Sequence, residues 1–166
     1  ENQFEVHYQP QFNINPQIIP GLEALIRWNH PEKGMIMPDS FIPIAEETNL
    51  ICDIGNWMLD ASMKILQQWN KNTDLQNIVL AINISATQFA QVEFIDSVLN
   101  TMEKYNINGK QIELEITENI MLDDVQLVVS KLKQLGHHGI RFAIDDFGMG
   151  YSSLSYLQEL PLNNLK

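Results

Sequence analysis

Short apolar segments alternate along the chain with longer segments in which apolar residues recur every three or four positions. Short runs that are apolar or strictly alternating are typical of β-strands, whereas the longer spacing is typical of amphipathic helices. Six segments predict strands: residues 4–8, 18–28, 78–84, 111–117, 140–145 and 164–166. No low-complexity segment, internal repeat or obvious linker interrupts the alternation, so the sequence predicts one α/β unit.

The helical periodicity is clearest in three segments between the predicted strands. In the first, an apolar stripe follows Asp53, a suitable N-cap residue, and runs through residues 54–69. The second stripe spans residues 94–102. The third spans residues 125–135 and precedes Gly136, which fits the C′ position of a helix. Repeated units of this kind build either an open doubly wound sheet or a (β/α) barrel.

The positions of polar residues favour one of these two folds. An open sheet commonly places a glycine-rich loop after its first strand, and no such loop follows residues 4–8. A barrel instead carries its functional groups at the C-terminal ends of several strands. Polar residues close or follow successive predicted strands: Asn83, Glu115, Glu118, Asp145 and Asp146. We therefore expect an α/β fold of the TIM-like (β/α)8 barrel type.

The length of the chain qualifies this expectation. A (β/α)8 barrel has eight strands and typically about 250 residues, but this chain has 166 residues and only the six strands predicted above. We therefore expect residues 1–166 to form an incomplete barrel, either as a fragment of a longer protein or as a chain that a partner completes. An unfinished barrel exposes two strand edges, which favour aggregation unless something covers them.

The composition limits the classes of ligand. Lys and Arg number 10 against 21 Asp and Glu, which gives a formal net charge of −11 at pH 7. A protein that binds the phosphate backbone of DNA or RNA needs a basic face, so no nucleic-acid polymer is expected as a partner. An acidic chain that handles phosphate would need metal ions. The sequence also lacks an apolar run of about 18 residues and a basic start before an apolar stretch, which predicts a soluble piece.

Several acidic residues interrupt or directly follow apolar runs, among them Glu23, Glu115, Asp145 and Asp146. An uncompensated buried carboxylate costs several kcal/mol or shifts its pKa. If these four groups converge at one barrel mouth, each like-charge pair at about 4 Å costs on the order of 4 kcal/mol at an effective dielectric constant near 20. A hard divalent cation such as Mg²⁺ or Mn²⁺ would compensate the repulsion between these carboxylates, and Asn83 could add an amide oxygen as a ligand.

Cationic side chains are a weaker alternative to a metal, because position suggests Arg27, Arg141 and Lys166 alone. For any single acid, the simpler alternative is a surface position or a salt bridge. Glu113 in particular alternates with apolar neighbours and could face outward between helices. Taken together the acids favour a metal site, and their spacing leaves the number of metal ions open.

Six short motifs follow one another along the chain. They are YQP at residues 8–10, EALIRWNHP at 23–31, PDSFIPIAEE at 38–47, NIS at 83–85, EITE at 115–118 and DDFGMGYSSL at 145–154. Their composition and order resemble the EAL domain family, the cyclic di-GMP phosphodiesterases of bacterial second-messenger signalling. A lone Glu-Ala-Leu would carry little weight, whereas six motifs in the family's order make the resemblance specific. The resemblance also implies that residues 38–47 form a helix.

The resemblance implies a two-metal site with Mg²⁺ or Mn²⁺ as cofactor. Glu23, Asn83, Glu115 and Asp145 would be metal ligands, and Asp146 would contact the second metal of the pair. Such a site activates water as hydroxide and stabilises both the attacking and the leaving oxygen of an in-line displacement. It would also supply the positive charge that this acidic chain lacks.

The resemblance further implies roles around the metals. Lys166 would lie near the attacking water, and Glu118 would hold the loop at residues 145–154 in shape. Three residues would contact the dinucleotide: Gln9, Leu25 and Arg27.

For the intact parent protein, the resemblance implies hydrolysis of cyclic di-GMP to linear pGpG. The family's general-base glutamate lies beyond the portion that residues 1–166 match, so we expect little or no turnover by this piece alone. The alternative is a regulatory EAL module that binds cyclic di-GMP without hydrolysing it. The resemblance also implies a homodimer formed through the 145–154 loop region and a cytoplasmic domain, in a parent that could carry sensory or GGDEF domains or a membrane anchor.

Overall fold

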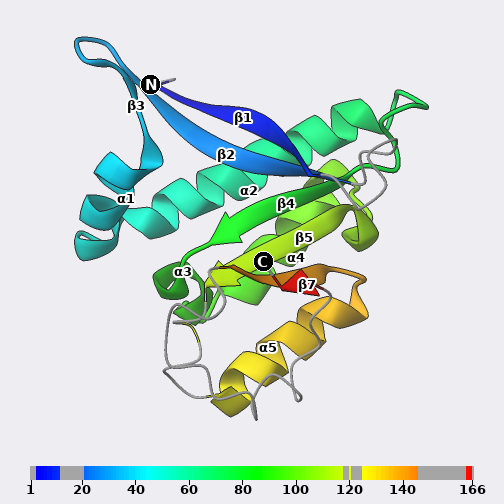
Figure 1. Ribbon diagram of the computed structural model, residues 1–166. Coiled ribbons are helices and arrows are strands. Elements are labelled where there is room, and N and C mark those ends of the chain that lie inside the picture. Colours follow the sequence, from blue (N-terminus) through cyan, green and yellow to red (C-terminus); the bar gives the residue numbers. More distant parts are fainter. Residues whose placement is uncertain (1–2, 12–20, 118–119, 121–124, 146–163, 166) are drawn as a thin grey trace.

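The computed structural model describes residues 3–11, 21–117, 120, 125–145 and 164–165 (Figure 1). The strands are β1 (Phe4–Gln11), β2 (Gly21–His30), β3 (Gly34–Ile36), β4 (Val79–Ile84), β5 (Ile112–Thr117), β6 (Arg141–Asp145) and β7 (Asn164–Leu165). The helices are α1 (Pro38–Glu47), α2 (Leu50–Trp69), α3 (Ala86–Ala90), α4 (Phe94–Tyr105) and α5 (Val125–His137), with one 3₁₀ turn at Gly109–Gln111. The six predicted strands are confirmed with shifted boundaries. The three-residue β3 is too short to have left a signal in the sequence.

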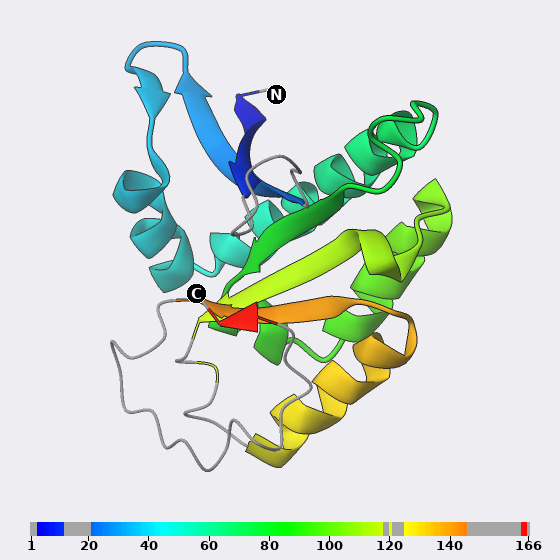
Figure 2. The same cartoon turned by 45° about the vertical axis from the view of Figure 1, so that its right-hand side comes forward.

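The strands form one mixed sheet in the order β1-β2-β4-β5-β6-β7, with β3 paired to β2 outside this path. β1 runs antiparallel to β2, whereas each pair from β2 to β7 along the path is parallel. Both views show α2, α4 and α5 on one face of the sheet (Figures 1 and 2). This is the succession of βα units that the sequence predicts, because parallel neighbours need a crossover connection that returns the chain to the same edge.

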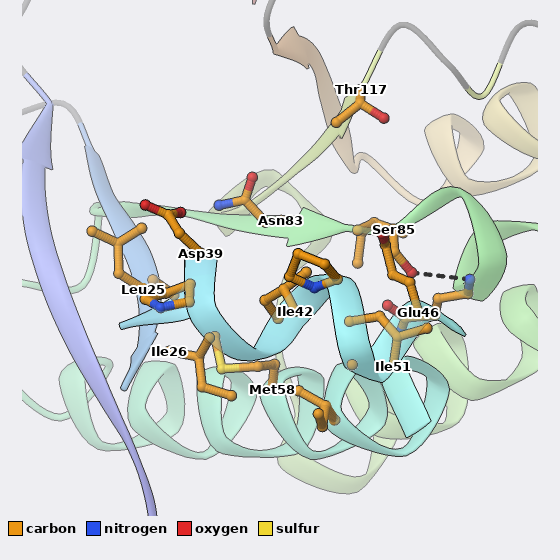
Figure 3. A pocket seen from close by; sticks show the side chains of 17 residues that line it. Leu25, Ile26, Asp39, Ile42, Glu46, Ile51, Met58, Asn83, Ser85 and Thr117 are labelled. Atoms are coloured by element: carbon orange, nitrogen blue, oxygen red, sulfur yellow. Dashed lines mark hydrogen bonds between the residues drawn. The ribbon is translucent and has the colours of Figure 1, made fainter. Parts of the chain in front are cut away.

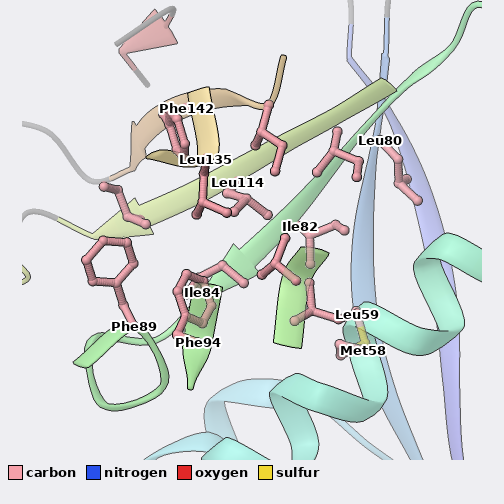
Figure 4. Close-up of a cluster of buried hydrophobic side chains, with 14 of the residues drawn as sticks. Met58, Leu59, Leu80, Ile82, Ile84, Phe89, Phe94, Leu114, Leu135 and Phe142 are labelled. Atoms are coloured by element: carbon pink, nitrogen blue, oxygen red, sulfur yellow. The ribbon is translucent and has the colours of Figure 1, made fainter. Parts of the chain in front are cut away.

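The core lies between the sheet and these helices (Figure 4). Every second residue of β4 points into it, namely Leu80, Ile82 and Ile84, all at most 2% exposed. Leu114 of β5 and Phe142 of β6 continue the same layer. Burying a side chain of this size contributes about 1.5–3 kcal/mol each, so this layer fixes which face of every strand turns away from the helices.

The 20-residue helix α2 ties β1 to the rest of the fold. The ring of Phe4 lies 5.6 Å from that of Trp57, and the ring of Tyr8 lies 5.2 Å from that of Trp69. Burial against the helix raises the pKa of the Tyr8 hydroxyl. The residues that alternate with Phe4 and Tyr8 along β1 therefore face the opposite side of the sheet.

Although α2 is the longest helix in the described part of the chain, no helix there has the length and apolar character needed to cross a membrane.

Two predicted helix ends are wrong, for physical reasons that the structure supplies. Asp53 does not cap α2, because the helix already begins at Leu50, after Asn49 with φ 60°. Asp53 lies instead in the first turn, where an acidic group interacts favourably with the helix dipole. Gly136 is not a C′ residue, because α5 continues to His137, and the left-handed conformation falls on Gly139 with φ 90°.

This difference between the two glycines predicts opposite effects of alanine. Gly136→Ala should raise the free energy of unfolding by up to about 1 kcal/mol, because alanine is the better helix former. Among the described residues, the added Cβ would meet Cε2 of Phe142 at 3.9 Å, which is ordinary contact. Gly139→Ala should lower the free energy of unfolding by about 1 kcal/mol or more, because alanine is strained at positive φ.

Urea unfolding of both variants beside the unmodified protein measures these changes. A loss of stability in Gly136→Ala comparable to that in Gly139→Ala would contradict the helix end described for α5.

Candidate functional site

The predicted site residues share the sheet face that points away from the helices, called the inner face below. Ala24, Ile26, Ile82 and Leu114 belong to the core on the helix side, and side chains alternate between the two faces of a strand. The inner face therefore carries the residues between them: Gln9, Gln11, Glu23, Leu25, Arg27, Ala81, Asn83, Glu113, Glu115 and Asp145. Period-two alternation is what brings residues distant in sequence into one site.

Glu23 and Asn83 meet directly on the inner face. The amide Nδ2 of Asn83 donates a hydrogen bond of 2.9 Å to Oε1 of Glu23. Glu23 is paired in register with Ala81, so Asn83 is its diagonal neighbour on the adjacent parallel strand. The neutral amide satisfies a carboxylate oxygen without adding charge, and its own carbonyl oxygen is a donor atom of the kind that Mg²⁺ binds.

Glu115 lies deeper on the inner face, and its side chain is 1% exposed. It is the register partner of Asn83 across the β4–β5 pair, which places it next to the Glu23–Asn83 pair. The amide Nε2 of Gln11, at the end of β1, donates a hydrogen bond of 3.2 Å to Oε1 of Glu115. A buried carboxylate needs such donors, since an unsatisfied one is costly.

Gln11 is a residue that sequence reasoning missed. The predicted strand stopped at residue 8, whereas β1 continues to Gln11. The signal was present in the sequence, because Gln9 and Gln11 continue the polar alternation that follows Tyr8. Extending the strand by one further alternation would have placed Gln11 on the same face as Gln9.

The other described site residues lie around this centre. Asp145 ends β6, is half-buried, and pairs in register with Thr117, two positions beyond Glu115. Gln9 is exposed and pairs in register with Glu23. Leu25 and Arg27 follow Glu23 on the same face of β2, and Nη1 of Arg27 donates a hydrogen bond of 2.8 Å to the carbonyl oxygen of Ile26.

Three predicted site residues, Glu118, Asp146 and Lys166, lie outside the described residues, as does the loop from 146 onward. Within the described part of the chain, no three His, Cys, Asp or Glu side chains converge closely enough to form a metal cluster by themselves. The described residues instead place carboxylates beside amide groups on the inner face. Carboxylate and amide oxygens are the hard donors that Mg²⁺ and Mn²⁺ prefer, so the chemistry of Glu23, Asn83, Glu115 and Asp145 fits such a cation.

Glu113 does not face outward between the helices. It is 3% exposed, lies on the inner face, and pairs in register with Arg141 of β6. The outward alternative considered for this residue is therefore wrong, because Ile112 and Leu114 occupy the helix side.

The segment after Asn83 is fixed from two sides. Ser85 caps α3 by accepting a hydrogen bond of 3.1 Å at its Oγ from the backbone N–H of Gln88. At the other end, the buried Nζ of Lys131 on α5 donates to the carbonyl oxygens of Phe89 at 2.7 Å and Gln91 at 2.9 Å. Burial lowers the pKa of the Lys131 ammonium. A short helix held at both ends gives the end of β4, and with it Asn83, a fixed position.

A cavity of about 410 Å³ opens beside the same strand ends, beneath α1 (Figure 3). Leu25 and Asn83 belong both to its lining and to the inner-face site. Its other walls are largely apolar, with residues such as Ile42 and Met58, while Asp39 adds a carboxylate. Clefts of about 300–1,000 Å³ with an apolar lining and a few polar groups commonly hold small ligands. Ala24, Ile26 and Ile84 also line the cavity, so most of it lies on the helix side of these strand ends.

Comparison with known proteins identifies the class to which this fold and site belong. The family model described as the EAL domain matches residues 1–166. The chain therefore belongs to the EAL domain family, as its motifs indicated.

Two relatives illustrate the match. The signaling protein YkoW of Bacillus subtilis is 43% identical over 166 residues, which cover 99% of this chain and 20% of YkoW. MucR of Pseudomonas aeruginosa, a bifunctional diguanylate cyclase and cyclic di-GMP phosphodiesterase, is 40% identical over 166 residues, which cover 99% of this chain and 24% of MucR. The chain thus spans a fifth to a quarter of the length of these relatives.

A solved structure of the MucR phosphodiesterase in complex with cyclic di-GMP has the same fold. It matches with a TM-score of 0.92 at 40% identity, over 98% of this chain and 66% of that chain. The predicted fold class, a TIM-like (β/α)8 barrel of which this chain forms about six strands, is confirmed.

Proposed function

We propose that this chain is part of a metal-dependent phosphodiesterase that hydrolyses cyclic di-GMP to linear pGpG. The observation that supports this most strongly is the arrangement on the inner face. There, Asn83 donates a hydrogen bond to Glu23 and is also the register partner of Glu115. The name of MucR, which includes cyclic di-GMP phosphodiesterase, adds support. In the reaction, a water oxygen bonds to phosphorus, one P–O3′ bond breaks, and the 3′ oxygen leaves with a proton.

The cofactor of this proposal is Mg²⁺ or Mn²⁺. Glu23, Asn83, Glu115 and Asp145 would hold the cations, with Asp146 as a ligand of the second. When bound, such cations lower the pKa of water and stabilise the charge that develops on both oxygens of the displacement. The described ligands come from four different strands, so each is held by strand pairing and not by a loop of its own.

The remaining proposed roles concern the nucleotide. Gln9, Leu25 and Arg27, which share the inner face with Glu23, would bind the dinucleotide. Arg27 would contribute the cationic group on β2, close to Glu23 in sequence. Lys166 would orient the attacking water, and Glu118 would hold the loop that carries Asp146.

We further propose the setting in which the domain works. It would form a homodimer through the loop at residues 145–154 in the cytoplasm, in a protein with sensory or diguanylate cyclase domains. Polymeric DNA and RNA are not proposed partners, because the net charge of −11 repels a polyanion. A small phosphodiester differs from such a polymer because two bound cations can neutralise its charge.

Hydrolysis is tested with the full-length protein, cyclic di-GMP and either Mg²⁺ or Mn²⁺, with pGpG quantified by chromatography. The unmodified protein should form pGpG, and Glu23→Ala should reduce kcat/KM by about 100-fold or more, because a cation ligand is lost. Glu32→Ala, in an exposed turn of the β2–β3 hairpin, is the matched control and should retain full activity. Tight binding of cyclic di-GMP without pGpG would contradict the enzyme and favour a binding module.

Asn83→Asp tests the metal site without reference to turnover. The change removes the donor to Glu23 and places a second carboxylate beside it, so without metal it should lower the free energy of unfolding by about 1–2 kcal/mol. Mn²⁺ should then raise the Tm of Asn83→Asp more than that of the unmodified protein, because the repelling carboxylates gain a cation between them. Asn100→Asp on the exposed side of α4 is the control. Equal Mn²⁺-dependent shifts in all three proteins would contradict a cation site at Asn83.

A further inference from the structure

The hydrogen bond between Gln11 and Glu115 spans an unusual distance across the sheet. Gln11 belongs to β1 and Glu115 to β5, and the strands β2 and β4 lie between them. The side chains nevertheless meet at 3.2 Å, from residues 104 positions apart in sequence. A contact of this kind requires that both intervening strands leave room on the inner face.

Both intervening strands carry a very small residue on the inner face, although the two are not register partners, because Ala81 pairs with Glu23. Gly21, the register partner of Gln11, begins β2 without any side chain, and Ala81 of β4 presents a single methyl group on the inner face. A Cβ on Gly21 would lie 2.9 Å from the carbonyl oxygen of Val79 and 3.3 Å from Oε1 of Gln11. The space over Gly21 is therefore filled by the backbone and by the Gln11 side chain.

The contact also suits the electrostatics of Glu115. This carboxylate is almost completely buried, and a buried polar group is costly unless it is hydrogen-bonded. An amide donor fixes the orientation of the carboxylate without bringing a positive charge. A lysine in its place would compete with a cation for Glu115, whereas glutamine does not.

We propose that Gln11 is a positioning residue for Glu115, which it holds in the orientation that binds the catalytic cation. This inference rests on the proposed function, in which Glu115 is a metal ligand. It parallels the role of Asn83 toward Glu23, with the difference that Gln11 acts through Glu115 and touches neither nucleotide nor reacting atoms. Groups that hydrogen-bond to metal ligands typically change metal affinity by about 10–100-fold when they are removed.

The test uses Gln11→Met in the full-length protein. Methionine has a similar length and no N–H donor, so Glu115 would lose the hydrogen bond from Gln11 with little change in volume. The Kd for Mn²⁺, measured by calorimetry without nucleotide, should rise by about 10–100-fold. At saturating Mn²⁺, the KM for cyclic di-GMP should stay within about twofold of the unmodified value and kcat should recover most of its loss, since the defect lies in metal binding.

Two further variants make the outcome decisive. Gln11→Leu also removes the N–H donor, but replaces it with a side chain of a different shape. It should show the same rise in the Kd for Mn²⁺, so the test still stands if Gln11→Met folds poorly. Gln134→Met, an exposed glutamine on α5, is the matched control and should leave Kd unchanged. If both Gln11 variants bind Mn²⁺ within twofold of the unmodified protein while their Tm falls, Gln11 is structural and the inference is overturned.

The same measurements separate this inference from the proposed function. Mn²⁺ binding without formation of pGpG contradicts the phosphodiesterase, and the ratio of Kd values still decides the role of Gln11. An unmodified protein that binds no Mn²⁺ overturns both.

Discussion

Buried carboxylates on the inner face of the sheet impose the constraint on which the rest of this structure depends. Glu115 and Glu113 are almost fully buried, and a buried carboxylate is costly unless hydrogen bonds or opposite charge compensate it. Neutral amides donate to inner-face carboxylates at two points: Gln11 donates to the buried Glu115, and Asn83 donates to the half-buried Glu23. Amides stabilise the carboxylates without neutralising them, so their negative charge stays available to a divalent cation.

The two faces of the sheet separate the packing of the core from the inner-face carboxylates. Apolar residues at every second position bind the strands to the helices, and that packing fixes which residues face inward. The parallel register then aligns Asn83 with Glu115, while the β5–β6 register sets Asp145 two positions farther along. Lys131 and Ser85 hold the short helix that follows Asn83.

Much of this organisation could be predicted from the sequence. The strands were visible because their apolar residues repeat with a short period, and Glu23, Asn83 and Glu115 stood out as polar residues within or at the ends of such runs. Gln11 could not be recognised as a partner of Glu115, because their contact crosses two intervening strands and joins residues 104 positions apart in sequence. The predicted ends of α2 and α5 are wrong because the left-handed backbone conformation falls on Asn49 and Gly139, and not next to Asp53 or on Gly136.

In the proposed function, the inner-face carboxylates and Asn83 bind divalent cations that engage a cyclic dinucleotide. Anomalous diffraction at the manganese edge, from crystals of the full-length protein grown with Mn²⁺ and cyclic di-GMP, would locate these cations. We expect manganese peaks within coordination distance of oxygens of Glu23, Asn83 and Glu115, next to a phosphate of the nucleotide. Bound nucleotide with no manganese peak at these residues, or with manganese held elsewhere, would contradict the proposed function.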